Sequence, residues 1–508
     1  MFFPSSDGSL AHAPLTSRSA SLPIRLRVEF LLGLSIFCCT VSALRGNVVL
    51  DWNAVVLDAI RAESTSPPLA SRNLAILHAA IYDTVNSIHR THQPYRVVLD
   101  PPPQVEVERS VGAAGFEVAS NLFPSFRARF EALFLAQVGP GGLTRAPDSD
   151  LELGRRVAAQ ILDARAADGS STERPYIPDE RPGQWRRTAP FFRPPLTPYW
   201  RYVIPFCLPD VEIIELKPPP ALGSAEYAAS LDEVRSLGGA VSARRTAEQT
   251  EIARFWSDFS YTATPPGHWL EIAADIARDV QLPLAGTARL FALLSLAQAD
   301  AAILCWEAKY RYHLWRPITA IQRADEDGNP ATIGDPNWDH FLAAPPFPSY
   351  TSGHSTFSQA ASRVLTHFLG RDAIRFGARS DALPGVIRTF DSLAACADEI
   401  GMSRIYGGIH FRFDNVEGKR TGRLVGDYVS ANFLLPLDSL PRLDLLSAAP
   451  DWTLLRVHGR RGHECVVESS PDLLRWRPVG TNTAMTGGFY LGDTTPMAAA
   501  RFYRVIER

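Results

Sequence analysis

The sequence predicts a mainly α-helical protein with a small β module at its C-terminal end. Apolar residues recur at three- and four-residue steps in several stretches between residues 72 and 404, which is the period of an amphipathic helix. Runs that alternate between apolar and polar residues, as strands do, are scarce until after Leu435. Hydrophobic residues make up 46% of the 508 residues and charged residues 21%, which is sufficient for an ordinary globular core.

The first 43 residues are predicted to be a secretory signal peptide. Arg25 and Arg27 precede an apolar run at residues 30–41, and small residues at 41–43 offer a cleavage site. Because the apolar run is too short to span a membrane comfortably, we expect a secreted or periplasmic protein with no stable membrane span in its mature form. An uncleaved membrane anchor is the alternative.

Residues 44–435 are predicted to form one helical domain. Its first clear helix follows Arg72, with Leu74, Leu77, Ile81 and Val85 on one face. Similar periodicity predicts further helices at residues 151–165, 225–237, 290–312 and 393–404. The segment 174–220 is rich in Pro and aromatic residues without a period, so we expect a long ordered loop there.

A strip of small residues is predicted near the end of this domain. Gly418, Gly422 and Gly426 recur at four-residue steps, so on a helix they share one narrow face that lets a neighbouring helix approach closely.

The composition changes after Leu435. A linker at residues 436–450 contains three prolines, and residues 451–508 are predicted to be the β module. Its expected strands lie at residues 452–457, 464–468, 489–491 and 501–505. The stretches 470–476 and 501–504 resemble a small β module found at the C-terminus of many exported bacterial proteins, and this resemblance implies no chemistry.

Charge and cysteine content exclude some classes of function. The net charge is −3 and no basic run stands out, so we expect no nucleic-acid partner. Four widely spaced cysteines with apolar neighbours are predicted to be buried rather than to form disulfides or a metal site: Cys207, Cys305, Cys396 and Cys465.

Three short polar stretches carry the candidate chemistry. They are Lys309 with Arg316-Pro317, then Ser352-Gly353-His354, then Ser403-Arg404 with His410. The seven residues from Lys309 to Arg316 are close to two helical turns, which predicts both cations on the same face of one helix. Ser352-Gly353-His354 precedes a stretch of helical period, and the N-terminus of a helix binds anions.

The third stretch is expected to bend. Gly407 and Gly408 separate Arg404 from His410 and favour a turn that lets His410 face the same centre. Asp414, four residues after His410, could accept a hydrogen bond from its ring. Together the stretches predict a site for a tetrahedral oxyanion, because buried cations need an anion to neutralise them.

In order and spacing, these stretches resemble the Lys-x6-Arg-Pro, Ser-Gly-His and Ser-Arg-x5-His motifs of the superfamily of vanadium-dependent haloperoxidases and type 2 phosphatidic acid phosphatases. The similarity is nearest to the chloroperoxidase-like branch and extends over residues 52–435, including the runs 255–258, 264–269 and 403–414. One departure is Thr351, where the superfamily commonly has a proline before Ser-Gly-His.

The resemblance implies a helical-bundle fold, vanadate as cofactor, and hydrogen peroxide, halide and small organic acceptors as partners. It implies that vanadate is held at its oxygens by a set of five residues: Lys309, Arg316, Ser352, Gly353 and Arg404. His410 would bind vanadium, with Asp414 as its orienting partner, and His354 would be the acid–base group. Trp306 and Phe347 resemble the aromatic wall near the halide, and Asp258 resembles the carboxylate that pairs with the arginine at Arg404.

The same residues admit more than one function. As a peroxidase, the protein would oxidise halide to hypohalous acid, with His354 accepting a proton and Lys309 polarising the bound peroxide. As an exported phosphatase, His410 would attack phosphorus, forming a phosphohistidine intermediate, and His354 would protonate the leaving group. A non-catalytic protein that binds phosphate is the third possibility. The surroundings at Trp306, Phe347 and residues 255–269 favour the peroxidase.

Overall fold

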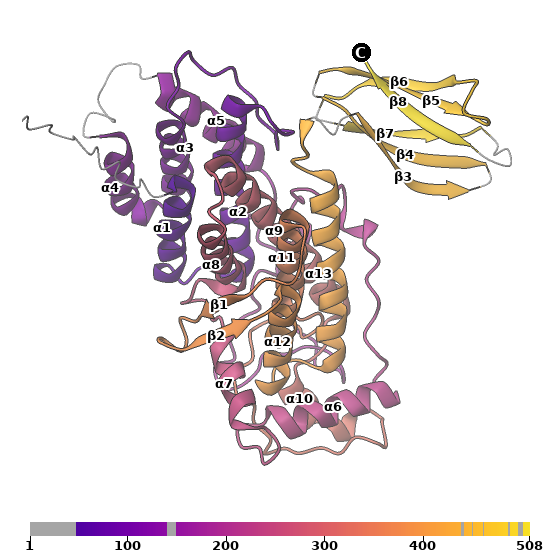
Figure 1. Cartoon of the computed structure of the whole chain (residues 1–508). Helices are drawn as coiled ribbons and strands as arrows, with labels where there is room; N and C mark the ends of the chain where they lie inside the picture. Colours follow the sequence, from indigo (N-terminus) through magenta and orange to yellow (C-terminus); the bar gives the residue numbers. More distant parts are fainter. Residues whose placement is uncertain are drawn as a thin grey trace, which may run out of the picture. The chain divides into compact units, whose positions relative to one another are not determined.

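The computed structural model describes residues 47–139, 149–437, 441–449, 451–460, 462–485, 488–495 and 501–508. The predicted signal peptide lies outside these residues. Thirteen α-helices occur in the described part: α1 (Val48–Ala62), α2 (Pro67–His89), α3 (Val107–Leu122), α4 (Arg127–Val138), α5 (Ser149–Arg165), α6 (Ala225–Gly238), α7 (Ala247–Phe255), α8 (Thr264–Asp279), α9 (Leu284–Tyr312), α10 (Pro317–Gln322), α11 (Gly353–Leu369), α12 (Leu393–Tyr406) and α13 (Arg412–Asn432). The mainly α-helical prediction is confirmed (Figure 1).

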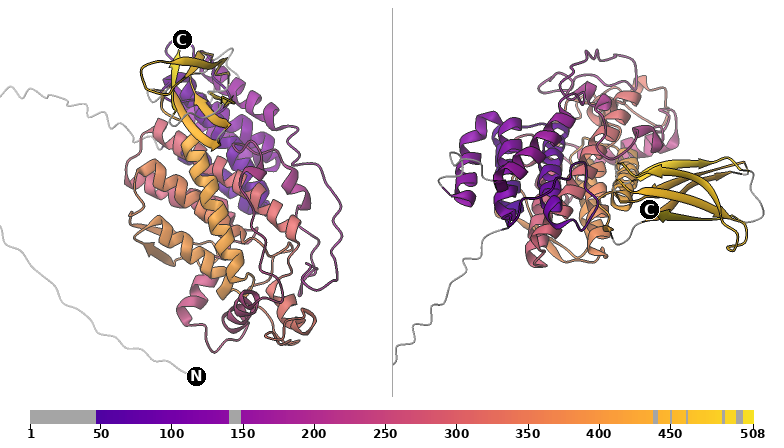
Figure 2. Two further views of the ribbon diagram at one scale, coloured as in Figure 1. Left: turned by 90° about the vertical axis from the view of Figure 1, so that its right-hand side faces the viewer. Right: turned by 90° about the horizontal axis from the view of Figure 1, so that it is seen from above.

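The long helix α9 forms the centre of the bundle. It contacts α2 on one side and α11 and α13 on the other, and α1, α3 and α5 form a further layer beyond α2 (Figures 1 and 2). α9 is long and apolar enough to cross a membrane, yet 94% of its most apolar window is buried inside the protein. Apolar residues occur on all sides of α9, and neighbouring helices cover each side, as expected of a core helix.

Helix ends follow from local sequence. Ser352 caps α11 with its side chain, which accepts a hydrogen bond from the Ser355 N–H, and Thr246 and Gln249 form a capping box at α7. The predicted helices at residues 151–165, 225–237, 290–312 and 393–404 are confirmed as α5, α6, α9 and α12. Between α5 and α6, residues 174–220 contain only short 3₁₀ turns, as the absence of a period predicts.

The glycine strip of α13 packs against α11. A Cβ atom added to Gly422 would lie 2.2 Å from the carbonyl oxygen of Thr356, and one on Gly418 would lie 2.8 Å from that of Ser352. The two backbones are therefore in direct contact, as predicted. The backbone N–H of Ser352 also donates to the carbonyl oxygen of Asp414 at 3.0 Å, which links the starts of the two helices.

Replacing Gly422 by alanine is expected to lower the free energy of unfolding by about 1–3 kcal/mol, because the new methyl group must push two backbones apart. Chemical denaturation monitored by circular dichroism measures this change. Gly223→Ala is the matched control, since nothing lies within 4 Å of a Cβ there. Equal stability of the two variants would contradict the close packing.

A short hairpin and a C-terminal β module complete the described chain. β1 (Phe376–Arg379) pairs with β2 (Ile387–Phe390), an element that the sequence did not predict. The module consists of two antiparallel sheets, in the orders β3-β4-β7 and β6-β5-β8. Its strands are β3 (Arg442–Ala449), β4 (Trp452–His458), β5 (Glu464–Ser470), β6 (Arg477–Thr483), β7 (Gly488–Asp493) and β8 (Phe502–Glu507).

The predicted linker is too long at its C-terminal end. Residues 442–449 were assigned to it, but they form β3 and pair with β4. The four strands that we predicted are present, while β3 and β6 were missed. The module has a small core of its own, which includes Leu455, Val457, Cys465 and Val467. All four cysteines outside the signal segment are buried with free thiols, as predicted.

Candidate functional site

Three cations lie in the core of the helical bundle. Lys309, Arg316 and Arg404 are 0%, 0% and 1% exposed. Their side chains donate to backbone carbonyl groups and form no ion pair with a carboxylate among the described residues, although fully buried Arg and Lys side chains are usually paired. Their shared environment is therefore strongly positive.

Lys309 is fixed by backbone oxygens. It lies in the last turn of α9, and its Nζ donates to the carbonyl oxygens of Pro348, Ser349 and Thr351 at 3.0, 3.1 and 2.5 Å. These oxygens belong to the loop before α11. Thr351, the departure from the common proline, thus keeps a carbonyl that holds the lysine.

Arg316 reaches the same place from outside α9. The helix ends at Tyr312, His313 is left-handed with a φ of 50°, and Arg316 is the N-cap residue of α10. The prediction that Lys309 and Arg316 share one helix face is therefore wrong, because the left-handed residue turns the chain between them. Arg316 Nε donates to the carbonyl of Phe347 and Nη1 to that of Ile409, each at 2.8 Å.

His410 follows a turn at the end of α12, as the glycines predicted. Gly408 has a φ of +75°, and a Cβ on it would lie 2.1 Å from the carbonyl oxygen of Gly238, so only glycine fits. The turn brings His410 Nε2 to 3.2 Å from Arg316 Nη1. Arg404, in the last turn of α12, donates from Nη1 to the carbonyl oxygen of Trp256 at 2.6 Å.

Asp414 orients the ring of His410. Its Oδ2 lies 2.9 Å from His410 Nδ1, as predicted, and it also accepts hydrogen bonds from the Phe411 N–H at 3.1 Å and from the Ser349 hydroxyl. The carboxylate thereby fixes which nitrogen carries the proton and leaves Nε2 facing the cations. Ser349, which the sequence analysis missed, has no motif of its own because its role depends on the fold.

Replacing Asp414 by asparagine is expected to weaken vanadate binding about 10- to 100-fold, because one acceptor oxygen becomes an NH₂ group and the ring of His410 is released. Titration of the protein with vanadate, followed by calorimetry, measures the affinity. Asp427→Asn is the matched control, since Asp427 holds His367 through a similar contact of 2.8 Å on the protein surface. Unchanged affinity in Asp414→Asn would remove the orienting role.

Burial and mutual repulsion shape the electrostatics of the site. Burial lowers the pKa of Lys309 to about 7, that of Arg316 to about 9 and that of Arg404 to about 10. Burial and the neighbouring cations also hold the pKa of His354 and of His410 well below the usual value. An anion placed among these groups would stabilise their charged forms, and vanadate or phosphate matches that requirement.

Several buried nitrogen atoms of the site residues lack a hydrogen-bond partner within the described part of the chain. Arg316 Nη2, Arg404 Nε and His354 Nε2 are buried nitrogen atoms without a hydrogen-bond partner among the described residues. Such atoms are costly unless a ligand satisfies them. The start of α11 adds the N–H groups of Gly353 and His354, which have no partner within the helix. The donor set therefore fits a tetrahedral oxyanion.

An adjoining cavity of about 420 Å³ gives access to this centre. Its lining includes His354, Arg404 and His410 together with Trp306 and Phe347, so the structure brings both parts of the predicted site together. The rings of Trp306 and Phe347 are 5.1 Å apart, and Lys309 Nζ lies 4.8 Å from the centre of the Phe347 ring. Outer lining residues that the sequence analysis missed are Phe191, Arg193, Phe259 and Tyr261.

Asp258 does not occupy its predicted place. No ion pair with Arg404 forms among the described residues, because the Trp256 carbonyl holds the guanidinium. Asp258 instead accepts a hydrogen bond from His268 at 3.0 Å and lies 3.7 Å from His354 Nε2. The charge of Asp258 still raises the pKa of Arg404, against the larger effect of burial. The two groups are therefore near each other without an ion pair.

Known proteins share this architecture. Residues 289–436, which contain all three motifs, match the family model described as the VCPO second helical-bundle domain. The vanadium chloroperoxidase of Curvularia inaequalis is 27% identical over 492 residues, covering 72% of this chain and 79% of that protein. A bacterial vanadium-dependent iodoperoxidase structure superposes with a TM-score of 0.65 at 29% identity, covering 76% of this chain and 96% of the other.

This chain is therefore similar in sequence and fold to vanadium-dependent haloperoxidases. This confirms the resemblance seen in the sequence, including the chloroperoxidase-like branch. A bacterial vanadium-dependent chloroperoxidase structure superposes on this chain with a TM-score of 0.60, covering 72% of it and 92% of the other chain. At 16% identity, that similarity concerns the fold alone.

Proposed function

We propose that this protein is a vanadate-dependent peroxidase that oxidises halide ions with hydrogen peroxide to hypohalous acid. The observation that carries the proposal is the convergence of three buried cations, Lys309, Arg316 and Arg404, on a histidine oriented by a carboxylate. Relatives of similar sequence are named for vanadium-dependent oxidation of chloride and iodide, which supports the same class of reaction.

Vanadate would be held by the residues that present unsatisfied donors. Arg316 and Arg404 would bind its oxygens through nitrogen atoms that have no partner among the described residues. Lys309, whose three N–H groups donate to backbone carbonyls, would contribute positive charge. Ser352 and Gly353 would contribute the start of α11, and His410 would bind vanadium. When bound, vanadate would act as a Lewis acid that activates peroxide, and the oxidation state of vanadium would not change. The protein supplies the fixed positive field, which costs no reorganisation during the reaction.

The remaining residues handle protons and the halide. A ring nitrogen of His354 accepts the proton that hydrogen peroxide loses on binding, since burial and nearby cations keep this ring neutral. Lys309, held by three backbone carbonyls, would add the positive charge that favours a peroxide bound at this site. Trp306 and Phe347 form an apolar wall that displaces water from the halide, and the cavity beyond them accommodates small organic acceptors. Residues 1–43 would direct the protein to the periplasm or outside the cell.

The deciding experiment pairs two assays on one preparation of the mature protein. Halogenation of monochlorodimedone is measured with peroxide, added vanadate and chloride, bromide or iodide in turn, beside hydrolysis of p-nitrophenyl phosphate. Vanadate-dependent halogenation that inorganic phosphate suppresses is the expected result. Ester hydrolysis inhibited by vanadate, without halogenation, would identify a phosphatase, and phosphate binding without either activity would identify a binding protein.

A further inference from the structure

Asp258 has an unusual backbone conformation next to the candidate site. Its φ is +43°, in the left-handed region, which aspartate adopts more readily than most residues because its short polar side chain bonds locally. Asp258 lies in the loop between α7 and α8, and its side chain is positioned between two histidines.

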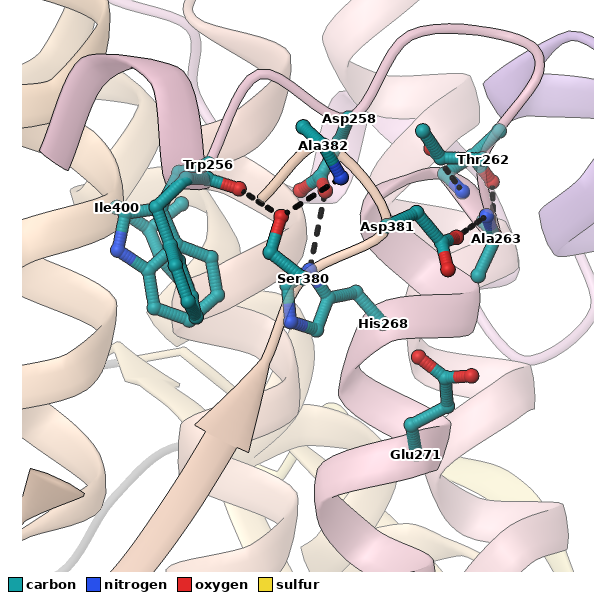
Figure 3. A network of polar contacts seen from close by, with 12 residues as sticks. Trp256, Asp258, Thr262, Ala263, His268, Glu271, Ser380, Asp381, Ala382 and Ile400 are labelled. Atoms are coloured by element: carbon teal, nitrogen blue, oxygen red, sulfur yellow. Dashed lines mark hydrogen bonds and ion pairs between the residues drawn. The ribbon is translucent and has the colours of Figure 1, made fainter. Parts of the chain in front are cut away.

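His268 holds the first oxygen of this carboxylate. It lies in the first turns of α8, is 4% exposed, and its Nδ1 is 3.0 Å from Asp258 Oδ1 (Figure 3). Its ring also packs on that of Trp256, with centroids 4.7 Å apart. Burial opposes protonation of His268, but the charge and hydrogen bond of Asp258, with smaller contributions from Glu271 and Asp381, outweigh it and raise the pKa of His268.

The second oxygen faces the acid–base group. Asp258 Oδ2 lies 3.7 Å from His354 Nε2, a buried nitrogen with no hydrogen-bond partner among the described residues. Arg404, the other cation near Asp258, is turned to the carbonyl oxygen of Trp256. Trp256 thus contributes twice, since its ring supports His268 while its carbonyl keeps Arg404 from the carboxylate.

We propose that His268 is a positioning residue that holds the carboxylate of Asp258 against His354 and away from Arg404. The inference rests on the proposed function, in which His354 takes up a proton. A carboxylate fixed beside the ring restricts its rotation, as an orienting carboxylate does for other acid–base histidines. Because His268 itself lowers the pKa of His354, the contribution proposed for His268 is positional. Without His268, the carboxylate is free to turn to Arg404 and to draw this guanidinium away from the oxyanion.

Four variants test the proposal kinetically. His268→Phe removes the hydrogen-bond donor, and kcat is expected to fall about tenfold while KM for halide and peroxide stays within about twofold. His268→Asn keeps an N–H close to the position of Nδ1, so it is expected to restore kcat to within about threefold of the wild type. Asp258→Asn should act like His268→Phe, and the double variant should be no worse than the more affected single one.

His78→Gln is the matched control. His78 is equally buried and bonds to a side chain, Asn53, at 3.2 Å, but it lies outside the site. Its replacement should change stability without changing kcat. Wild-type kcat in His268→Phe, or strict additivity of the two substitutions, would overturn the proposal. If His268→Phe does not fold, His268→Asn and Asp258→Asn still give a measurable comparison.

A readout without vanadate separates this inference from the proposed function. In protein labelled with ¹⁵N-histidine, the wild type should show a strongly deshielded Nδ1 proton for His268. The ring nitrogen shifts of His354 should move together in His268→Phe and Asp258→Asn, and stay constant in His78→Gln. Unmoved His354 shifts would refute the positioning role even if halogenation is found. Moved shifts without any halogenation would leave the coupling intact and reject the peroxidase.

Discussion

Replacing His410 by alanine is expected to abolish vanadate-dependent halogenation and to weaken vanadate binding by at least about 100-fold. His410 is the residue that binds vanadium in the proposed site. Its Nε2 faces Arg316, and its Nδ1 is held by Asp414. Outer contacts alone alter the affinity of metal sites by about 10- to 100-fold, so loss of the bonded atom itself has a larger effect. Vanadium NMR of the titrated protein and the monochlorodimedone assay measure the two losses.

Binding of phosphate distinguishes loss of the bond from loss of the site. Phosphate requires only the cations, so its affinity for His410→Ala should fall far less than that of vanadate. His367→Ala is the matched control, because His367 also pairs with an aspartate at 2.8 Å but lies on the surface of α11. Vanadate-dependent turnover at the wild-type rate in His410→Ala would contradict the assignment of this ligand.

Replacing Lys309 by methionine is expected to weaken both vanadate and phosphate about 10- to 150-fold, or about 1.5–3 kcal/mol, because the site loses one buried positive charge and the carbonyl groups that this charge holds. The side chains have similar length, so the change removes charge and donors more than volume. The three carbonyl oxygens that now accept from Nζ lose their donor, so a lower free energy of unfolding is expected as well. Calorimetric titration and thermal unfolding, each with and without the anion, measure these effects.

Lys419→Met is the matched control for Lys309→Met. Lys419 pairs with Asp398 at the surface of α13, where an exposed ion pair contributes about 1 kcal/mol at most. Its replacement should leave both anion affinities unchanged. If Lys309→Met binds phosphate as tightly as the wild type, the charge of Lys309 does not contribute to anion binding.

Local sequence predicted the helices well because their physical signals are local. The apolar period of residues 151–165 and 225–237 and the spacing of Gly418, Gly422 and Gly426 each follow from one helix and its nearest neighbour. The missed strands β3 and β6 are both edge strands with few buried residues, so neither carries a clear alternation. Their pairing is determined by β4 and β5 rather than by their own sequence.

The sequence identified the residues of the site but predicted only part of their arrangement. The ordered motifs identified the cations and both histidines, but the left-handed turn at His313 places Arg316 outside the helix of Lys309. Similarly, the φ of Asp258 and the position of His268 decide which partner the carboxylate takes. Single left-handed residues and backbone acceptors such as the Trp256 carbonyl have no sequence signature, so they appear only in three dimensions.

The contact between α11 and α13 determines which parts of the site can be varied in protein engineering. His354 lies on α11 and Asp414 on α13, and the backbones of these two helices are in direct contact. The distance between the two residues is therefore set by backbone packing, and side-chain substitutions between the helices can change it little. The cavity wall at Trp306 and Phe347, and its outer rim at Phe191 and Tyr261, consist of residues outside α11 and α13. Libraries that seek new acceptors or halides should therefore vary the wall and rim, and keep the glycine strip constant.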